Sequence, residues 1–132
     1  MTVDDVMRWL QSLGAPEGVQ GWTMARMDAS KERRIGVWQR DAGGGMGIAI
    51  GRARATRCKR IQLLVHWTRD AHETELAAQA LYDAIAACRR PSIGGAEADW
   101  IDLAMPEPAD LGADGAGIFE RAIRLDIYHQ QA

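Results

Sequence analysis

The stretch IQLLVHWTRDAHETELAAQALYDAIAA, residues 61–87, decides the fold because it passes from one structural period to another. Its first part belongs to KRIQLLVHWT (59–68), in which apolar residues recur at every second position. This alternation predicts a central strand. The two faces of the strand would be formed by Ile61, Leu63, Val65 and Trp67 on one side and by Leu64 and His66 on the other. Because both faces carry apolar residues, we expect something to cover each side of the strand.

A helix is predicted directly after this strand. The segment HETELAAQALYDAIAAC (72–88) is rich in alanine, which has the highest helix propensity. Asp70 stands at the N-cap position, with Glu73 placed for a reciprocal hydrogen bond. The buried stripe of this helix is predicted to contain Leu81, Ile85 and Cys88, with Ala77 and Ala84 beside them.

The residues before the central strand predict another helix and then short strands. Apolar residues at helical spacing predict a helix over 3–13, with Thr2 as the N-cap and Asp5 completing a capping box. The segments 21–27 and 35–40 are typical of strands, and the glycines of AGGGMGIAIG (42–51) indicate a hairpin turn followed by a returning strand, MGIAI.

The C-terminal part predicts two more strands. ADWIDLAM (98–105) is the first, and a loop rich in proline and glycine then leads to Gly117. The second alternates between an apolar face with Phe119, Ile123, Leu125 and Ile127 and a polar face with Glu120, Arg124, Asp126 and Gln130. The order α-β-β-β-β-α-β-β predicts a single α+β domain over 1–132, with one mixed or antiparallel sheet of about five or six strands packed by two helices.

Composition restricts the class of protein. The 132 residues are 47% hydrophobic and 26% charged, which is ordinary for a globular domain, and the net charge of −2 gives no electrostatic reason to bind nucleic acid. The two cysteines lie far apart without metal-binding or redox spacing. The acidic N-terminus MTVDDVMRWL is unlike an export signal, and no apolar run reaches the length of a membrane span. We therefore expect a soluble intracellular chain without membrane contact.

The sequence predicts no catalytic centre, cofactor site or metal site. GMGIAIG (45–51) has glycines spaced as GxGxxxG, but β-branched residues follow them where a dinucleotide-binding loop would open a helix. The three histidines, His66, His72 and His129, show no ligand spacing, and no serine lies in a GxSxG motif. A small nucleotide-binding or hydrolytic enzyme that uses Gly43–Gly51 and Cys58 is retained as an alternative.

A turn is predicted before the last strand. Gly112, Asp114 and Gly117 lie close together, which could indicate a phosphate or calcium loop. GADGAG supplies too few oxygen ligands for calcium, whereas aspartate and glycine are typical of turns. We therefore interpret these three residues as turn-forming.

Two sets of residues are candidates for contacts with partners. RARATRCKR (52–60) contains the cations Arg52, Arg54, Arg57, Lys59 and Arg60, which would form either a solvated strand edge or a positive rim that meets phosphates or an acidic neighbouring subunit. Among the five tryptophans, Trp22 and Trp38 are the candidates for a subunit contact, because tryptophan is enriched at interfaces.

Several motifs in the second half of the chain carry a family resemblance. They are LYDAI (81–85), the matching positions of PADLGADGAG at Pro108, Leu111, Gly112, Asp114 and Gly117, and LDIYH at Leu125, Ile127 and Tyr128. In this order they resemble the minor capsid and tail-terminator-like proteins of long-tailed bacteriophages, and the likeness covers roughly residues 59–130.

The resemblance implies a structural protein that is made in the host bacterial cytoplasm and built into the virion. It would assemble into a ring, expected to be a hexamer, that contacts tail-tube and head-connector proteins and lets DNA pass through its lumen. The basic stretch 52–60 would face the lumen or the next ring. It implies no small-molecule substrate and no cofactor. The remaining alternative is a monomeric adaptor that captures a partner strand at a sheet edge.

Overall fold

The computed structural model describes residues 1–40, 48–49 and 55–130. These residues form two helices and eight strands. In chain order they are α1 (Val3–Ser12), β1 (Gly21–Met24), β2 (Arg34–Gln39), β3 (Ile48–Ala49), β4 (Ala55–His66), α2 (Ala71–Ala86), β5 (Ser92–Ile93), β6 (Ala96–Leu103), β7 (Ala109–Ala113) and β8 (Phe119–Gln130). Neither helix is long and apolar enough to cross a membrane.

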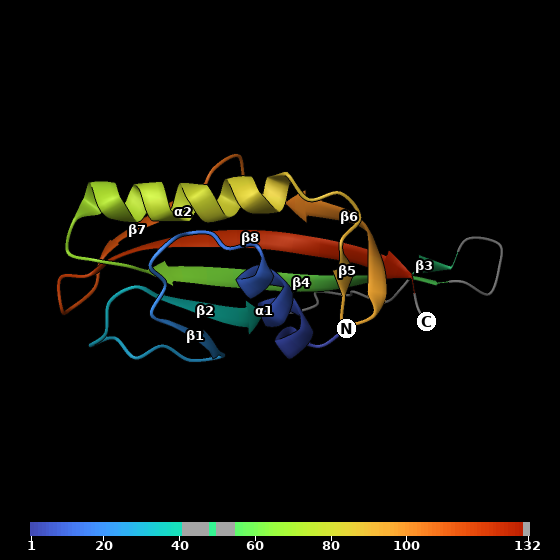
Figure 1. The fold of residues 1–132 in the computed structure, drawn as a ribbon, viewed down its shortest axis with the longest axis horizontal. Helices are drawn as coiled ribbons and strands as arrows, with labels where there is room; N and C mark the ends of the chain where they lie inside the picture. Colours follow the sequence, from blue (N-terminus) through green and yellow to red (C-terminus); the bar gives the residue numbers. More distant parts are fainter. Residues whose placement is uncertain (41–47, 50–54, 131–132) are drawn as a thin grey trace.

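The sheet is built around β4 and β8, two strands of 12 residues each that pair antiparallel along almost their whole length. The strand order is β1-β2-β4-β8-β6-β5, with β3 added to β4 and β7 added to β8 (Figure 1). β1 runs parallel to β2 and every other described pair is antiparallel, so the sheet is mixed. The predicted α+β class with one sheet and two helices is confirmed.

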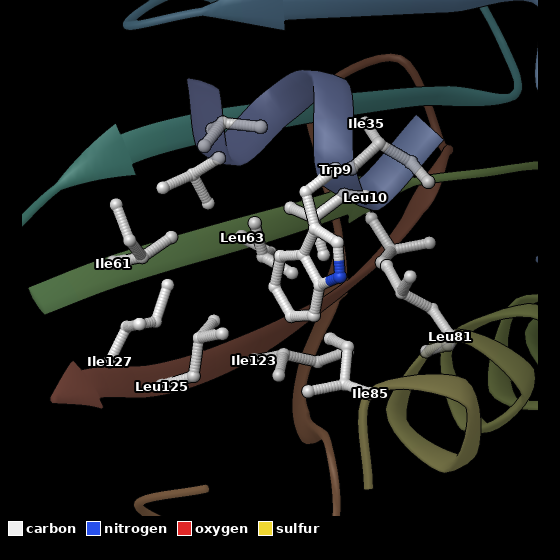
Figure 2. Close-up of a cluster of buried hydrophobic side chains, with 14 of the residues drawn as sticks. Trp9, Leu10, Ile35, Ile61, Leu63, Leu81, Ile85, Ile123, Leu125 and Ile127 are labelled. Carbon is white, nitrogen blue, oxygen red and sulfur yellow. The ribbon is translucent and has the colours of Figure 1, made fainter. Parts of the chain in front are cut away.

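Both helices pack on the same face of this sheet. Directly paired residues of neighbouring strands share a face, and Val37, Leu63 and Ile123 form one such row. Figure 2 shows Trp9 and Leu10 of α1 and Leu81 and Ile85 of α2 over the side chains of β2, β4 and β8. The helices cover only one side of β4. On the other side His66 is buried beside the Ala29 carbonyl, whereas Gln62 and Leu64 are half-buried, so the expectation that each side is covered is confirmed only at the His66 end.

The helix ends follow from local hydrogen bonds. At α1, the Thr2 backbone N–H donates to Asp5 Oδ2 (2.8 Å) and the Asp5 N–H donates to Thr2 Oγ1 (3.0 Å), which confirms the predicted capping box. At α2, Asp70 Oδ1 accepts from the backbone of His72 and Glu73, as predicted. The reciprocal bond predicted for Glu73 is wrong, because its Oε2 accepts from the Thr68 hydroxyl.

Three strand predictions need correction. β5 and β7 lie in segments that were predicted as loops, and β7 is formed because residues 109–113 reach the free edge of β8. β1 ends at Met24, short of the predicted 27. β3 pairs with β4, with Ile48 opposite Thr56. The glycine turn predicted at the start of 42–51 lies outside the described residues.

Candidate functional site

The side of the sheet opposite the helices is a surface without a helix in the described chain, and it is defined here as the open face. Its rows run across β2, β4, β8 and β6, and strand register fixes its membership. The first two rows are Cys58, Tyr128 and Trp100, followed by Arg40, Arg60, Asp126 and Asp102. The middle row is Trp38, Gln62 and Arg124. The last two rows are Gly36, Leu64 and Ala122, followed by Arg34, His66 and Glu120.

An aromatic pair occupies one end of the open face. The rings of Trp100 and Tyr128 are stacked, with centroids 5.3 Å apart and planes inclined by 17°. Trp100 is 60% exposed, the largest exposed fraction among the large hydrophobic residues described. The pKa of the Tyr128 hydroxyl is raised, first by the charge of neighbouring Cys58 and then by burial. Tyr128 therefore keeps its proton and remains a hydrogen-bond donor at neutral pH.

A row of charges lies beside the aromatic pair. Arg40 forms an ion pair with Asp126, and both side chains are largely withdrawn from solvent, with exposed fractions of 23% and 15%. The Nε atoms of Arg40 and Arg60 are buried without a hydrogen-bond partner in the described residues. These Nε atoms are inaccessible from the surface, so the row presents the remaining charged groups of its side chains to a partner.

The open face is also hollowed in its middle. Trp38, Gln39, Arg40, Gln62 and Leu64 line a shallow depression of about 330 Å³. Trp38 forms one wall, with its ring folded back over Gly36. The depression is therefore bordered by an aromatic ring, an aliphatic side chain and three polar side chains, the composition expected of a partner-binding surface.

The residues predicted as partner contacts do not form a single surface. Trp38 lies on the open face, whereas Trp22 packs against the core under the helices. Strand alternation also divides the basic stretch, because Arg57 and Lys59 point to the helix side while Arg60 points to the open face. Lys59 Nζ donates to Gln39 Oε1 at 2.9 Å. Arg52 and Arg54 lie outside the described residues.

Trp100 was missed by the sequence prediction although a signal was present. In WIDL (100–103), Trp100 and Asp102 lie on the solvent-exposed side of the strand, while Ile101 and Leu103 pack against the core. A tryptophan in phase with polar residues on a half-buried strand is expected to be exposed.

The turn predicted before the last strand has the expected local geometry. Asp114 Oδ1 accepts the backbone N–H groups of Ala116 (2.8 Å) and Ile118 (3.0 Å). Gly117 has φ 82° and Gly112, which lies in β7 next to a bulge, has φ 75°. Both angles are in the left-handed region that glycine adopts without strain. The backbone N–H groups hold the pKa of Asp114 below its usual value.

The same aspartate also reaches a buried histidine at the far end of the open face. His66 is completely buried, and its Nδ1 lies 2.9 Å from Glu120 Oε2 and 3.7 Å from Asp114 Oδ2. Its Nε2 lies 3.2 Å from the carbonyl oxygen of Ala29. His66 lies far from Asp114 and Glu120 in the sequence, so residue spacing gave no signal that these side chains meet.

The comparisons with known proteins add no family to this description. No family model matches the chain, and none of the curated proteins matches it.

Proposed function

We propose that this chain is a structural protein of a bacteriophage or prophage particle that works by assembling with copies of itself into a closed ring. In this proposal it is a minor capsid or tail-terminator-type component at the joint between head and tail. It is made in the bacterial cytoplasm, and its neighbours are tail-tube and head-connector proteins. The observation that carries the proposal is the open face, a long sheet surface on which the described chain places no helix.

The size of the open face suits a subunit contact. The strands β2, β4, β8 and β6 contain 6, 12, 12 and 8 residues, and at about 3.3 Å per residue and about 4.8 Å per strand they give an area of roughly 600 Å². A stable interface needs about 800 Å² on each partner, so the face supplies most of one. A strand with apolar residues on both faces is expected where both faces are covered. Leu64 is the apolar residue of β4 on the open face, and a second subunit would cover it.

The chemistry of the open face also suits a contact between proteins. Tryptophan, tyrosine and arginine are the residues most enriched where binding energy concentrates, and Trp100, Tyr128 and Arg60 lie in adjacent rows. The stacked pair presents an apolar surface beside the row of charged residues that contains Arg60 and Asp126.

A ring requires a second and different surface. If the open face met another open face, a two-fold dimer would result, whereas contact with a different patch related by rotation closes a ring. Leu76, which is 57% exposed on the outside of α2, offers such a patch on the helix side. The family resemblance supports the ring, since the positions that carry it are structural: Leu81 and Ile85 are buried, and Gly117 shapes the turn.

The proposal is tested by measuring mass in solution for the wild type and three variants. We expect size-exclusion chromatography with light scattering to give one closed oligomer, and negative-stain electron microscopy to show rings. Trp100→Glu places a charge on the open face and Leu76→Glu places one on α2. In a ring both variants dissociate the oligomer, whereas in a two-fold dimer only Trp100→Glu does so. Gln20→Glu, which adds the same charge in an exposed loop, is the matched control and should assemble normally.

Two outcomes would contradict the proposal. A wild-type chain that stays monomeric at all concentrations would favour the adaptor that binds a partner strand. A dimer that survives Leu76→Glu would exclude the ring while retaining the open face as an interface.

A further inference from the structure

Three side chains with metal-binding atoms converge at one end of the open face. His66 ends β4, Glu120 lies directly opposite it on β8, and Asp114 stands in the turn that joins β7 to β8. His66 Nδ1, Asp114 Oδ2 and Glu120 Oε2 all lie within 4.8 Å of one another. The exposed fractions of the side chains are 0%, 17% and 19%, so the three atoms meet in a largely dry place.

The surroundings of His66 fix which ring nitrogen is free. The Ala29 carbonyl can only accept a hydrogen bond, so the nearby Nε2 carries a proton and donates it. The other ring nitrogen, Nδ1, faces two carboxylate oxygens, Glu120 Oε2 at 2.9 Å and Asp114 Oδ2 at 3.7 Å. Metal-binding histidines have this arrangement, in which the second nitrogen donates to a backbone carbonyl and the first binds the ion.

Asp114 also has a carboxylate oxygen that is available to bind an ion. Its Oδ1 is fully used by two backbone N–H groups of the turn. Its Oδ2 is buried and has no hydrogen-bond partner in the described chain, although it points toward Nδ1 from 3.7 Å. That separation is too long for a hydrogen bond, but it suits two ligands of one ion, which lie at about 2.0–2.2 Å from zinc.

The charges also favour a divalent cation. The two carboxylates carry a charge of −2 when ionised, which a divalent ion cancels and a single proton does not. Two neighbouring arginines have contacts of their own, although the charge of Arg69 also helps to lower the pKa of Asp114. Arg34 extends over β1, where a Cβ on Gly21 would come 2.8 Å from its Cζ, and Arg69 donates to the Ala116 carbonyl outside the cluster.

We propose that His66, Asp114 and Glu120 bind a divalent transition-metal ion of the zinc class. One nitrogen and two oxygen ligands suit Zn²⁺, with water in the fourth position, whereas Mg²⁺ and Ca²⁺ prefer oxygen alone. The ion would join the end of β4 to the start of β8 and to the turn before it. The site does not depend on the proposed ring, because all three ligands belong to one chain.

The test is titration of chelator-treated, dialysed protein with ZnCl₂ by isothermal calorimetry. We expect one Zn²⁺ per chain in the wild type and no binding of Mg²⁺. Asp114→Asn keeps an oxygen for the two turn hydrogen bonds but loses the carboxylate, and should weaken Zn²⁺ binding at least about 100-fold. Asp110→Asn is the matched control, because Asp110 Oδ1 accepts the Gly112 N–H in the same hairpin while lying outside the cluster.

A spectroscopic measurement distinguishes a metal ion from a proton at His66 Nδ1. Long-range ¹H–¹⁵N spectra of the metal-free chain should show His66 protonated on Nε2 alone, with a Nδ1 shift that moves on adding Zn²⁺. Equal melting temperatures of metal-free wild type and Asp114→Asn would show that the variant folds. The site is refuted if the wild type binds no stoichiometric Zn²⁺, or if Asp114→Asn binds it as tightly as Asp110→Asn. A His66 ring protonated on both nitrogens and unaffected by Zn²⁺ also refutes it.

Discussion

The indole of Trp38 lies over Gly36, two residues earlier on the same strand. A Cβ atom built on Gly36 would come 2.5 Å from Trp38 Cη2. The ring therefore lies flat along the open face and occupies the space that any other residue at position 36 would fill. Gly36 is buried as a result, although no helix of the described chain lies above it.

Gly36→Ala is expected to destabilise the chain by about 1–3 kcal/mol, because the new methyl group must displace the ring. Chemical denaturation measures the loss, and the intrinsic tryptophan fluorescence should change as Trp38 moves. Gly115→Ala is the control, since nothing lies within 4 Å of a Cβ at that position. Equal stability of both variants would show that Trp38 does not rest on Gly36.

Leu63→Ala and Leu64→Ala should separate the two faces of β4. Leu63 is completely buried under the helices, so its truncation should cost about 2–5 kcal/mol in the free energy of unfolding. Leu64 is half-buried on the open face, and its truncation should cost less than half as much. Unfolding experiments at a concentration where the chain is monomeric provide the comparison. If Leu64→Ala proved equally harmful to the monomer, the open face would already be covered within one chain.

Asp126 and Asp102 face each other across β8 and β6, yet their removal should have opposite effects. Asp126→Asn leaves the partly buried Arg40 without its ion-pair partner and should destabilise the fold by roughly 1–3 kcal/mol. Asp102→Asn removes a like charge directly opposite Asp126 and should be neutral or slightly stabilising. Thermal denaturation of both variants tests the sign. A loss of stability for Asp102→Asn equal to that for Asp126→Asn would contradict this account.

His129 should make the stability depend on pH. Burial lowers its pKa below the usual 6.5, and the cations Arg57 and Lys59 and the N-terminus act in the same direction. The unfolded chain therefore binds this proton more readily than the folded chain, so stability is full above about pH 6.5 and falls as the pH decreases toward the native pKa. His129→Gln should flatten this part of the stability profile, measured by urea unfolding between pH 5 and 8. An unchanged slope would assign the dependence to other groups.

The elements that were predicted well are those determined by local patterns. The 61–87 stretch predicted β4 and α2 because alternation, alanine content and the Asp70 cap all lie within a few residues of each other. The capping box of Thr2 and Asp5 is local in the same way. β7 was missed because residues 109–113 have the composition of a loop, and only the free edge of β8 makes them a strand.

The candidate surfaces depended on register, which the sequence does not display. Arg57 and Arg60 are close in sequence but lie on opposite faces of β4, because side chains alternate along a strand. The positive rim predicted from local charge density is therefore not a single surface. His66 and Glu120 are distant in sequence and become direct neighbours only when β4 and β8 pair. The histidine cluster was therefore not visible before the strand partners were known, whereas the exposure of Trp100 was.

The central position of β8 also has a consequence for synthesis. β4 finds its main partner only in Phe119–Gln130, the last strand of the described chain. In a nascent polypeptide that has emerged only as far as Ile118, the edge of β4 that pairs with β8 is still free. Such an exposed strand edge can pair with other chains. Folding must wait until β8 has left the ribosome, and termination of translation before Phe119 would yield an aggregating fragment instead of a smaller domain.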